Sequence, residues 1–166
     1  MRAIERADIE AVLVAESRPG REGIILAEDL ADRVDVTLAS DADLAWAIHE
    51  FEPGALLIGA DAIRPDGAVI NKVGSRGAAL AAAREGLEVF VVATLDKITH
   101  SRDVAVETVD PGEIYDGDGD VTVRSPLFDV TPPDLIDGIC TEDGMLVDRD
   151  IETVVDEHRQ NRRWLA

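Results

Sequence analysis

The sequence of 166 residues is short of cysteine, lysine and long apolar runs, and each shortage excludes a class of protein. A single cysteine, Cys140, excludes an internal disulfide framework and a cysteine-rich metal site. No apolar run reaches the roughly 18 residues of a membrane span, and the N-terminal sequence MRAIERADIEAVLVAES interrupts its apolar stretch with acidic residues. We therefore expect a cytoplasmic protein with neither a secretory signal nor a membrane partner.

Basic residues are also scarce, because 16 Lys and Arg stand against 35 Asp and Glu, for a formal net charge of -19. Nucleic-acid grooves need clustered basic side chains, so direct binding to DNA or RNA is not expected. Apolar residues make up 46% of the chain, which is enough for one folded core, and we predict a single domain over residues 1–166. A solvated acidic coat on such a domain suggests the salt-rich cytosol of a halophile.

Lysine is the rarest of the charged residues. The chain has 14 arginines and two lysines, Lys72 and Lys97. In a chain almost without lysine, these two are expected at positions where a compact ammonium group is required. The alternative is that their positions are due to chance.

Hydrophobic periodicity predicts alternating strands and helices. Continuous apolar runs at 11–16, 34–40, 55–63 and 88–96 predict strands. Amphipathic patterns at 21–34, at 41–52 after the N-cap-like Ser40, and at 71–86 up to Gly86 predict helices. This order indicates an α/β fold, a Rossmann-like open, mostly parallel sheet with helices on both faces. One more apolar run lies within 125–146, and residues 148–166 predict a polar helix with Ile151, Val154, Val155 and His158 on one side.

Polar residues at the ends of these strands are the candidate ligand-binding groups. Ligands of open parallel sheets bind at the carboxyl ends of the strands. Residues 16–18, Asp61 and residues 94–97 follow three of the predicted strands, so they are expected on one rim. The loop PDGAVINKVG is predicted to return to that rim and to place Asn71 and Lys72 at a helix N-terminus, where free N–H groups favour a phosphate.

Each candidate has a structural alternative. Asp61 could cap the turn after its strand, and Asn71 and Lys72 could simply begin a helix. Lys97 could be a solvated loop charge paired with Asp96, and Arg18 could pair with a neighbouring acid instead of a phosphate. His49, His100 and His158 have no metal-ligand spacing, and neither a dinucleotide fingerprint nor a Walker sequence occurs. We expect no metal and no cofactor.

Three segments carry a resemblance to a known family. They are VAESRPGREGIILAEDL, GADAIRPDGAVINKVGSRGAALAAAREGLEVFVVATLDK and FDVTPPDLIDGICTEDG. Together they resemble the family that contains the α, β and δ subunits of eukaryotic translation initiation factor 2B, methylthioribose-1-phosphate isomerase and ribose-1,5-bisphosphate isomerase. The resemblance covers most of residues 10–146.

The resemblance implies roles for individual residues. Asp61 matches the acid/base aspartate of the isomerases, Asn71 and Lys72 match the pair that holds the sugar phosphate, and Lys97 matches a further substrate-binding lysine. Full-length members also have an N-terminal helical region that leads to a catalytic cysteine, and this chain resembles only their C-terminal half. Cys140 stands where the family has an apolar residue, so it is expected to be a small buried hydrophobe.

Three functions remain open at this stage. The first is an initiation factor 2B-like module for regulation or assembly, which binds a phosphorylated sugar or nucleotide and pairs as a homodimer or with a related subunit. The second is half of an aldose–ketose phosphate isomerase, of the ribose-1,5-bisphosphate or methylthioribose-1-phosphate type, which needs a partner to supply the cysteine. The third is an acidic scaffold whose crevice is vestigial.

Overall fold

The structure, a computed structural model, describes residues 9–101, 107–146, 151, 153 and 154. Its contacts divide the chain into two compact units, Met1–Pro53 and Gly54–Ala166. The predicted helix over 148–166 lies mostly outside the described residues, although Ile151 and Val154 are helical and Ile151 is buried. A single domain for the whole chain stays a prediction.

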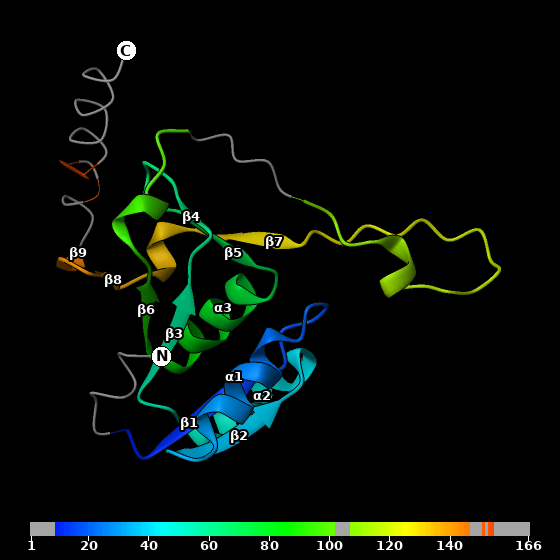
Figure 1. The fold of residues 1–166 in the computed structure, drawn as a ribbon, viewed down its shortest axis with the longest axis horizontal. Coiled ribbons are helices and arrows are strands. Elements are labelled where there is room, and N and C mark those ends of the chain that lie inside the picture. Colours follow the sequence, from blue (N-terminus) through cyan, green and yellow to red (C-terminus); the bar gives the residue numbers. More distant parts are fainter. Residues whose placement is uncertain (1–8, 102–106, 147–150, 152, 155–166) are drawn as a thin grey trace. The chain divides into compact units, whose positions relative to one another are not determined.

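The first unit is a βαβ arrangement followed by a helix (Figure 1). It contains β1 (Ala11–Ala15), α1 (Glu22–Leu30), β2 (Asp35–Ala39), the 3-10 turn η2 (Asp41–Asp43) and α2 (Leu44–Phe51). β1 and β2 are parallel, with Ala11 opposite Asp35. A Cβ atom on Gly23 would clash with the carbonyl oxygen of Ala15, so a glycine is required where α1 meets the end of β1. Ser40 Oγ accepts from the Asp43 N–H at 3.3 Å, which confirms the predicted N-cap.

The second unit is built on a mostly parallel sheet (Figure 1). Its strands are β3 (Ala55–Gly59), β6 (Glu88–Val92), β8 (Gly138–Thr141) and β9 (Gly144–Leu146), in the order β3-β6-β8-β9. Pairs β3–β6 and β6–β8 are parallel, and β9 joins β8 antiparallel. Val89, Val91 and Ile139 are almost fully buried in it, as expected for strands covered by other elements.

A second sheet in this unit was not predicted. It consists of β4 (Ala62–Ile63), β5 (Val69–Lys72) and β7 (Phe128–Thr131), all antiparallel, in the order β4-β5-β7. The prediction that residues 65–74 form a loop ending at a helix was therefore wrong. Ala68, Val69 and Ile70 are buried, and β5 pairs with a strand from far along the chain. Asn71 and Lys72 end this strand and do not begin the helix.

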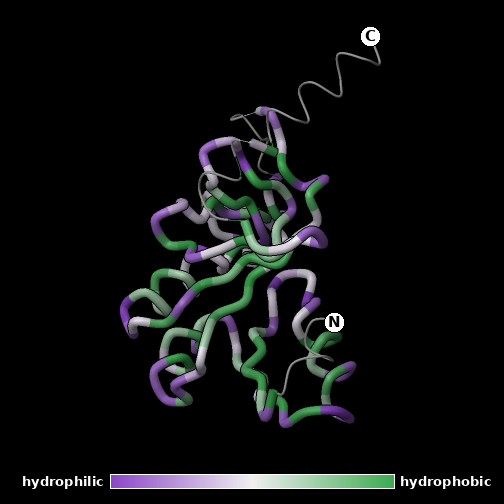
Figure 2. The backbone as a smooth tube through the Cα atoms, turned by 90° about the vertical axis from the view of Figure 1, so that its left-hand side faces the viewer, coloured by the Kyte–Doolittle hydropathy of each residue, from purple (hydrophilic) through white to green (hydrophobic). Residues whose placement is uncertain are grey.

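The alanine-rich helix α3 (Ser75–Glu85) covers β3, β6 and β7. Ala78, Ala79 and Ala82 form its buried side, and their small side chains allow a close approach to the strands. Gly86 follows the helix in the left-handed region, which confirms the predicted C-cap. The unit also contains the 3-10 turns η3 (Leu95–Lys97), η4 (Pro111–Glu113) and η5 (Pro133–Leu135). Figure 2 shows hydrophobic residues along the strands and hydrophilic ones in many of the turns.

The α/β prediction with mostly parallel strands is confirmed. β1–β2, β3–β6 and β6–β8 are parallel pairs, although the described strands fall into three sheets and not into one. Among the helices of the described part, none has the length and apolar character of a membrane span.

Candidate functional site

Asp61 and Asn71 flank the last residue pair of the β4–β5 hairpin. Ala62 pairs with Ile70, Asp61 directly precedes Ala62, and Asn71 directly follows Ile70. The Asp61 N–H donates to the carbonyl of Ile70 at 2.8 Å. Asp61 is exposed and Asn71 is half-buried. The carboxylate is therefore accessible to a ligand next to an amide held by the strand.

The Asn71 side chain is fixed from two directions. Its Nδ2 donates to Ser75 Oγ at 2.8 Å, and that hydroxyl donates to the carbonyl of Lys72, also at 2.8 Å. A Cβ atom on Gly59 would lie 3.5 Å from Asn71 Oδ1. The amide therefore lies between the end of β3 and the first residue of α3.

Lys72 ends β5 and lies over an aromatic ring. Its Nζ is 5.7 Å from the ring centroid of Phe128, the residue opposite it in β7. A cation over the face of a ring is attracted by the ring quadrupole. The contact with the ring helps to hold the ammonium group at this position.

Lys97 is brought to the same edge by a backbone contact. Ile98 forms a parallel bridge with Ile63, and the Thr99 N–H donates to the Ile63 carbonyl at 2.8 Å. The residues just before this bridge are Lys97 on one side and Ala62 on the other. The segments after β3 and β6 thus meet at one edge, next to the end of β5 with Asn71 and Lys72. The ligand-binding roles of Asp61, Asn71, Lys72 and Lys97 stay a prediction.

Arg18 belongs to the first unit. Its Nε donates to Glu16 Oε1 at 3.3 Å, and its side chain is 64% exposed. Its backbone N–H donates to Asp41 Oδ2 at 2.7 Å. The structure thus shows the pairing with a neighbouring acid, one of the two alternatives that the sequence left open for Arg18.

Asp129 is the residue of this region that sequence reasoning missed. Its carboxylate accepts from the Gly74 N–H at 2.8 Å and from the Arg76 N–H at 3.2 Å, at the start of α3. The expectation of free N–H groups for a phosphate is wrong for these two groups, because an internal carboxylate already binds them. Burial raises the pKa of Asp129. The hydrogen bonds from both N–H groups and the charge of Arg76 lower it, but they do not cancel the effect of burial. A carboxylate inside the apolar segment FDVT was the signal that could have revealed it.

Other sequence features do not add ligands to this edge. In the described ranges, no three His, Cys, Asp or Glu side chains are grouped to hold a metal ion. Cys140 is half-buried in β8, and its carbonyl accepts from the Ala93 N–H at 3.1 Å. It is a strand residue, less enclosed than the buried hydrophobe expected from the sequence.

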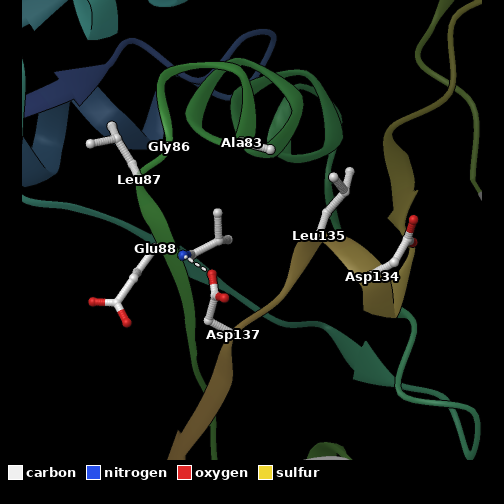
Figure 3. Close-up of a pocket in the computed structure, with 8 residues that line it drawn as sticks. Ala83, Gly86, Leu87, Glu88, Asp134, Leu135 and Asp137 are labelled. Carbon is white, nitrogen blue, oxygen red and sulfur yellow. Dashed lines mark hydrogen bonds between the residues drawn. The ribbon is translucent and has the colours of Figure 1, made fainter.

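A cavity of about 250 Å³ lies elsewhere in the second unit (Figure 3). It is lined by Ala83, Gly86, Leu87, Glu88, Val89, Asp134, Leu135 and Asp137. These residues surround the start of β6, the end of α3 and the segment before β8, so the cavity is at the opposite end of β6 from Lys97. Its charged groups are three carboxylates, which would repel a phosphate.

The comparison with known families identifies the chain. Residues 2–147 match the initiation factor 2 subunit family. The chain belongs to this family. The resemblance inferred from the three sequence segments is thereby confirmed, and it covers the candidate residues in both units.

Relatives in this family carry two kinds of name. Ribose 1,5-bisphosphate isomerase of Haloferax volcanii is 36% identical over 86% of this chain and 46% of its own length. The structure of 5-methylthioribose 1-phosphate isomerase from Pyrococcus horikoshii has a TM-score of 0.78 and 28% identity over 89% of this chain and 44% of the other. The structure of translation initiation factor eIF-2B from the same organism has a TM-score of 0.77 and 34% identity over 90% of this chain and 54% of the other. The chain thus spans about half the length of these relatives.

Proposed function

We propose that this member of the initiation factor 2 subunit family is a cytoplasmic, initiation factor 2B-like domain that binds a phosphorylated sugar or nucleotide, with a role in regulation or assembly. The observation that carries the proposal is the position of its two lysines. Lys72 and Lys97 both lie at the edge where β3 and β6 end, together with Asp61 and Asn71. In a chain with a net charge of -19, two ammonium groups at one sheet edge favour an anionic ligand.

Each residue of this edge has a distinct part in the proposal. Lys72 and Lys97 would bind phosphate oxygens, because ammonium groups are common phosphate ligands in proteins. The Asn71 amide, already oriented by Ser75, would bind a hydroxyl group of the ligand. The exposed Asp61 would accept from a second hydroxyl. Arg18, in the first unit, is proposed separately as a phosphate ligand, since its guanidinium is exposed.

An aldose–ketose phosphate isomerase is the second candidate, and the names of the relatives favour it. The reaction consumes no oxidant, since the aldose and the ketose are isomers. The bond between C1 and the ring oxygen breaks as that oxygen takes up a proton, and C2 then loses its proton to give an enol phosphate. C1 next gains a proton while the C2 hydroxyl gives up its own to become the ketone, and Asp61 could assist the transfer between C2 and C1. The single cysteine of this chain lies in β8, so we propose that a partner chain supplies the catalytic cysteine.

Calorimetric titration of the 166-residue chain in molar KCl tests the binding proposal. The ligands are ribose 1,5-bisphosphate, methylthioribose 1-phosphate and AMP. We expect binding of at least one, and a loss of about tenfold or more in affinity for Lys72→Ala and for Lys97→Ala. Arg84→Ala is the matched control, because Arg84 is an exposed cation in the last turn of α3. Equal losses in all three variants would show that only the total charge matters, and no heat with any ligand would refute the proposal.

Two further measurements separate the candidates. Turnover of a sugar phosphate by the chain alone would favour the isomerase and would contradict the need for a partner cysteine. The molar mass in solution, measured by light scattering, tests the proposed homodimer, and a monomer that binds a related family subunit would favour the mixed assembly.

A further inference from the structure

Three carboxylates in the chain bind backbone N–H groups of the segments that carry the candidate cations. Asp41 accepts from the N–H groups of Ser17 and Arg18, at 2.9 and 2.7 Å. Asp129 accepts from those at the start of α3, after Lys72. Glu142 accepts from the Leu95 N–H with both oxygens, at 3.2 and 3.0 Å, at the start of the turn that contains Lys97. These are charge-assisted hydrogen bonds, which are stronger than bonds between neutral groups.

Asp41 and Glu142 occupy equivalent places, each after a strand that pairs in parallel, and Asp129 lies within a strand that pairs antiparallel. Asp41 follows β2, the partner of β1, and binds the segment after β1. Asp129 is in β7, the partner of β5, and binds the segment after β5. Glu142 follows β8, the partner of β6, and binds the segment after β6. In each case the carboxylate lies in or just after one strand of a pair, and it binds the segment that follows the other strand of that pair.

We propose that Asp129 is the positioning residue for Lys72, and that Glu142 has the same role for Lys97. The proposal rests on the proposed function, in which these two lysines bind the phosphate. Neither carboxylate touches the ligand, and each acts through the backbone of the segment that carries the lysine.

The contacts around Asp129 show how it acts. Leu127 accepts from the Val73 N–H at 2.9 Å, Phe128 lies under the Lys72 ammonium, and Asp129 holds the two N–H groups that follow. Three consecutive residues of one segment thus hold the whole turn from Lys72 into α3. Gly74 lies in this turn with φ at +107° and makes it pliable, so a bond across the chain is needed to define its path.

The bonds to Asp129 also limit which groups of this turn can bind a ligand. The N–H groups of Gly74 and Arg76 are bound to Asp129 and are not available to a phosphate. The ligand is therefore held by side chains, and its affinity depends on where the turn places the ammonium of Lys72. Removal of Asp129 frees the N–H groups but displaces the lysine.

Asp137 is a matched control for both carboxylates. It accepts from the Val89 N–H at 2.8 Å, and it joins the segment before β8 to the start of β6 (Figure 3). Like the bonds of Glu142, this bond joins a carboxylate to a backbone N–H across the β6–β8 pair. It lies at the end of the pair where β6 and β8 begin, and the bonds of Glu142 lie where they end. Loss of Asp137 destabilises the fold without moving either lysine.

The test compares Asp129→Asn, Asp129→Ala, Glu142→Gln and Asp137→Asn in the full chain. We expect about fivefold to tenfold weaker ligand binding for Asp129→Ala, a smaller loss for Asp129→Asn, which keeps one acceptor oxygen, and a measurable loss for Glu142→Gln. Asp137→Asn is expected to bind as the unmodified chain does. Equal loss in Asp137→Asn, or unchanged binding in the Asp129 variants, overturns the proposal. If Asp129→Ala fails to fold, the near-isosteric Asp129→Asn and the exposed-turn variant Glu142→Gln still decide it.

A ligand-independent measurement separates this proposal from the proposed function. The side-chain protons of Lys72 lie in the ring current of Phe128, so their NMR shifts report the position of the ammonium arm. We expect these shifts to change in Asp129→Asn and to remain in Asp137→Asn. If the unmodified chain binds no ligand, the proposed function fails, while an unchanged Lys72 signal in Asp129→Asn is the result that refutes positioning.

Discussion

Gly59, the last residue of β3, lies against the side chain of Asn71. The nearest contact of a Cβ atom at this glycine would be Asn71 Oδ1, at 3.5 Å, and Nδ2 would follow at 3.9 Å. Asn71 in turn donates to Ser75 at the start of α3. The bare backbone of Gly59 therefore leaves the space that the amide occupies between the parallel sheet and the helix.

The size of the residue at position 59 is expected to control the orientation of Asn71. Gly59→Ala places its methyl group at ordinary contact distance, and we expect a change in unfolding free energy within about 0.5 kcal/mol. Gly59→Val adds branches that displace the amide, with a loss of about 1–3 kcal/mol from overpacking. Urea unfolding measures the stability, and the NMR signals of the Asn71 amide show its displacement. Equal behaviour of the two variants would contradict this prediction.

Gly74 is expected to be required for its backbone conformation and not for space. Its φ is +107°, and a Cβ atom there would meet nothing within 4 Å. We expect Gly74→Ala to destabilise the chain by about 1–3 kcal/mol. Gly77→Ala is the matched control, because that position is also open but lies within α3, where alanine should stabilise by about 0.5–1 kcal/mol. Similar effects at both positions in chemical unfolding would show that the turn is not strained.

Asp129 is expected to make stability fall as pH rises. Burial raises its pKa in the folded chain above the ordinary value of 3.8, although Arg76 opposes the shift, so the folded state binds more protons than the unfolded state between the two pKa values. Stability then decreases with increasing pH across that window, from about pH 4 upward. Asp129→Asn removes this dependence, which urea unfolding at a series of pH values will measure. The prediction is contradicted if, as pH increases, the unmodified chain becomes more stable relative to Asp129→Asn. Asp134→Asn is the control for the loss of one exposed carboxylate.

High salt is expected to stabilise the chain, because its net charge is -19. The Debye length falls from roughly 8 Å at 0.15 M to 3 Å at 1 M salt, which screens repulsion between the acidic side chains. We expect the thermal midpoint to rise as KCl is increased from about 0.15 to molar concentrations. Sucrose at matched osmolality controls for solvent exclusion. Indifference of the midpoint to KCl would refute the halophilic interpretation.

Much of the local structure was predictable because it depends on neighbouring residues. Ser40 and Gly86 mark the ends of helices by hydrogen bonds and backbone angles confined to a few residues. The strands β1, β2, β3 and β6 follow from short apolar runs. The place of Asp61 and Lys97 after two neighbouring strands was also predicted, since parallel strands bring the segments that follow them to one edge.

The partners of these elements were not predictable from the same patterns. The run AVINK was interpreted as a loop, because its strand character depends on pairing with β7 from far along the chain. The role of Asp129 depends on the same pairing, which brings its carboxylate to N–H groups more than 50 residues earlier. The pairing of Arg18 with Glu16 was one of two alternatives in the sequence, and only the structure shows it.

The sequence by itself determined the α/β class, the caps at Ser40 and Gly86 and the charged residues that follow β3 and β6, because those depend on periodicity and local hydrogen bonding. Only the tertiary structure decided which N–H groups at the edge are already bound by carboxylates. Those bonds join residues that no local pattern connects, and they exist only because the strands pair in this order.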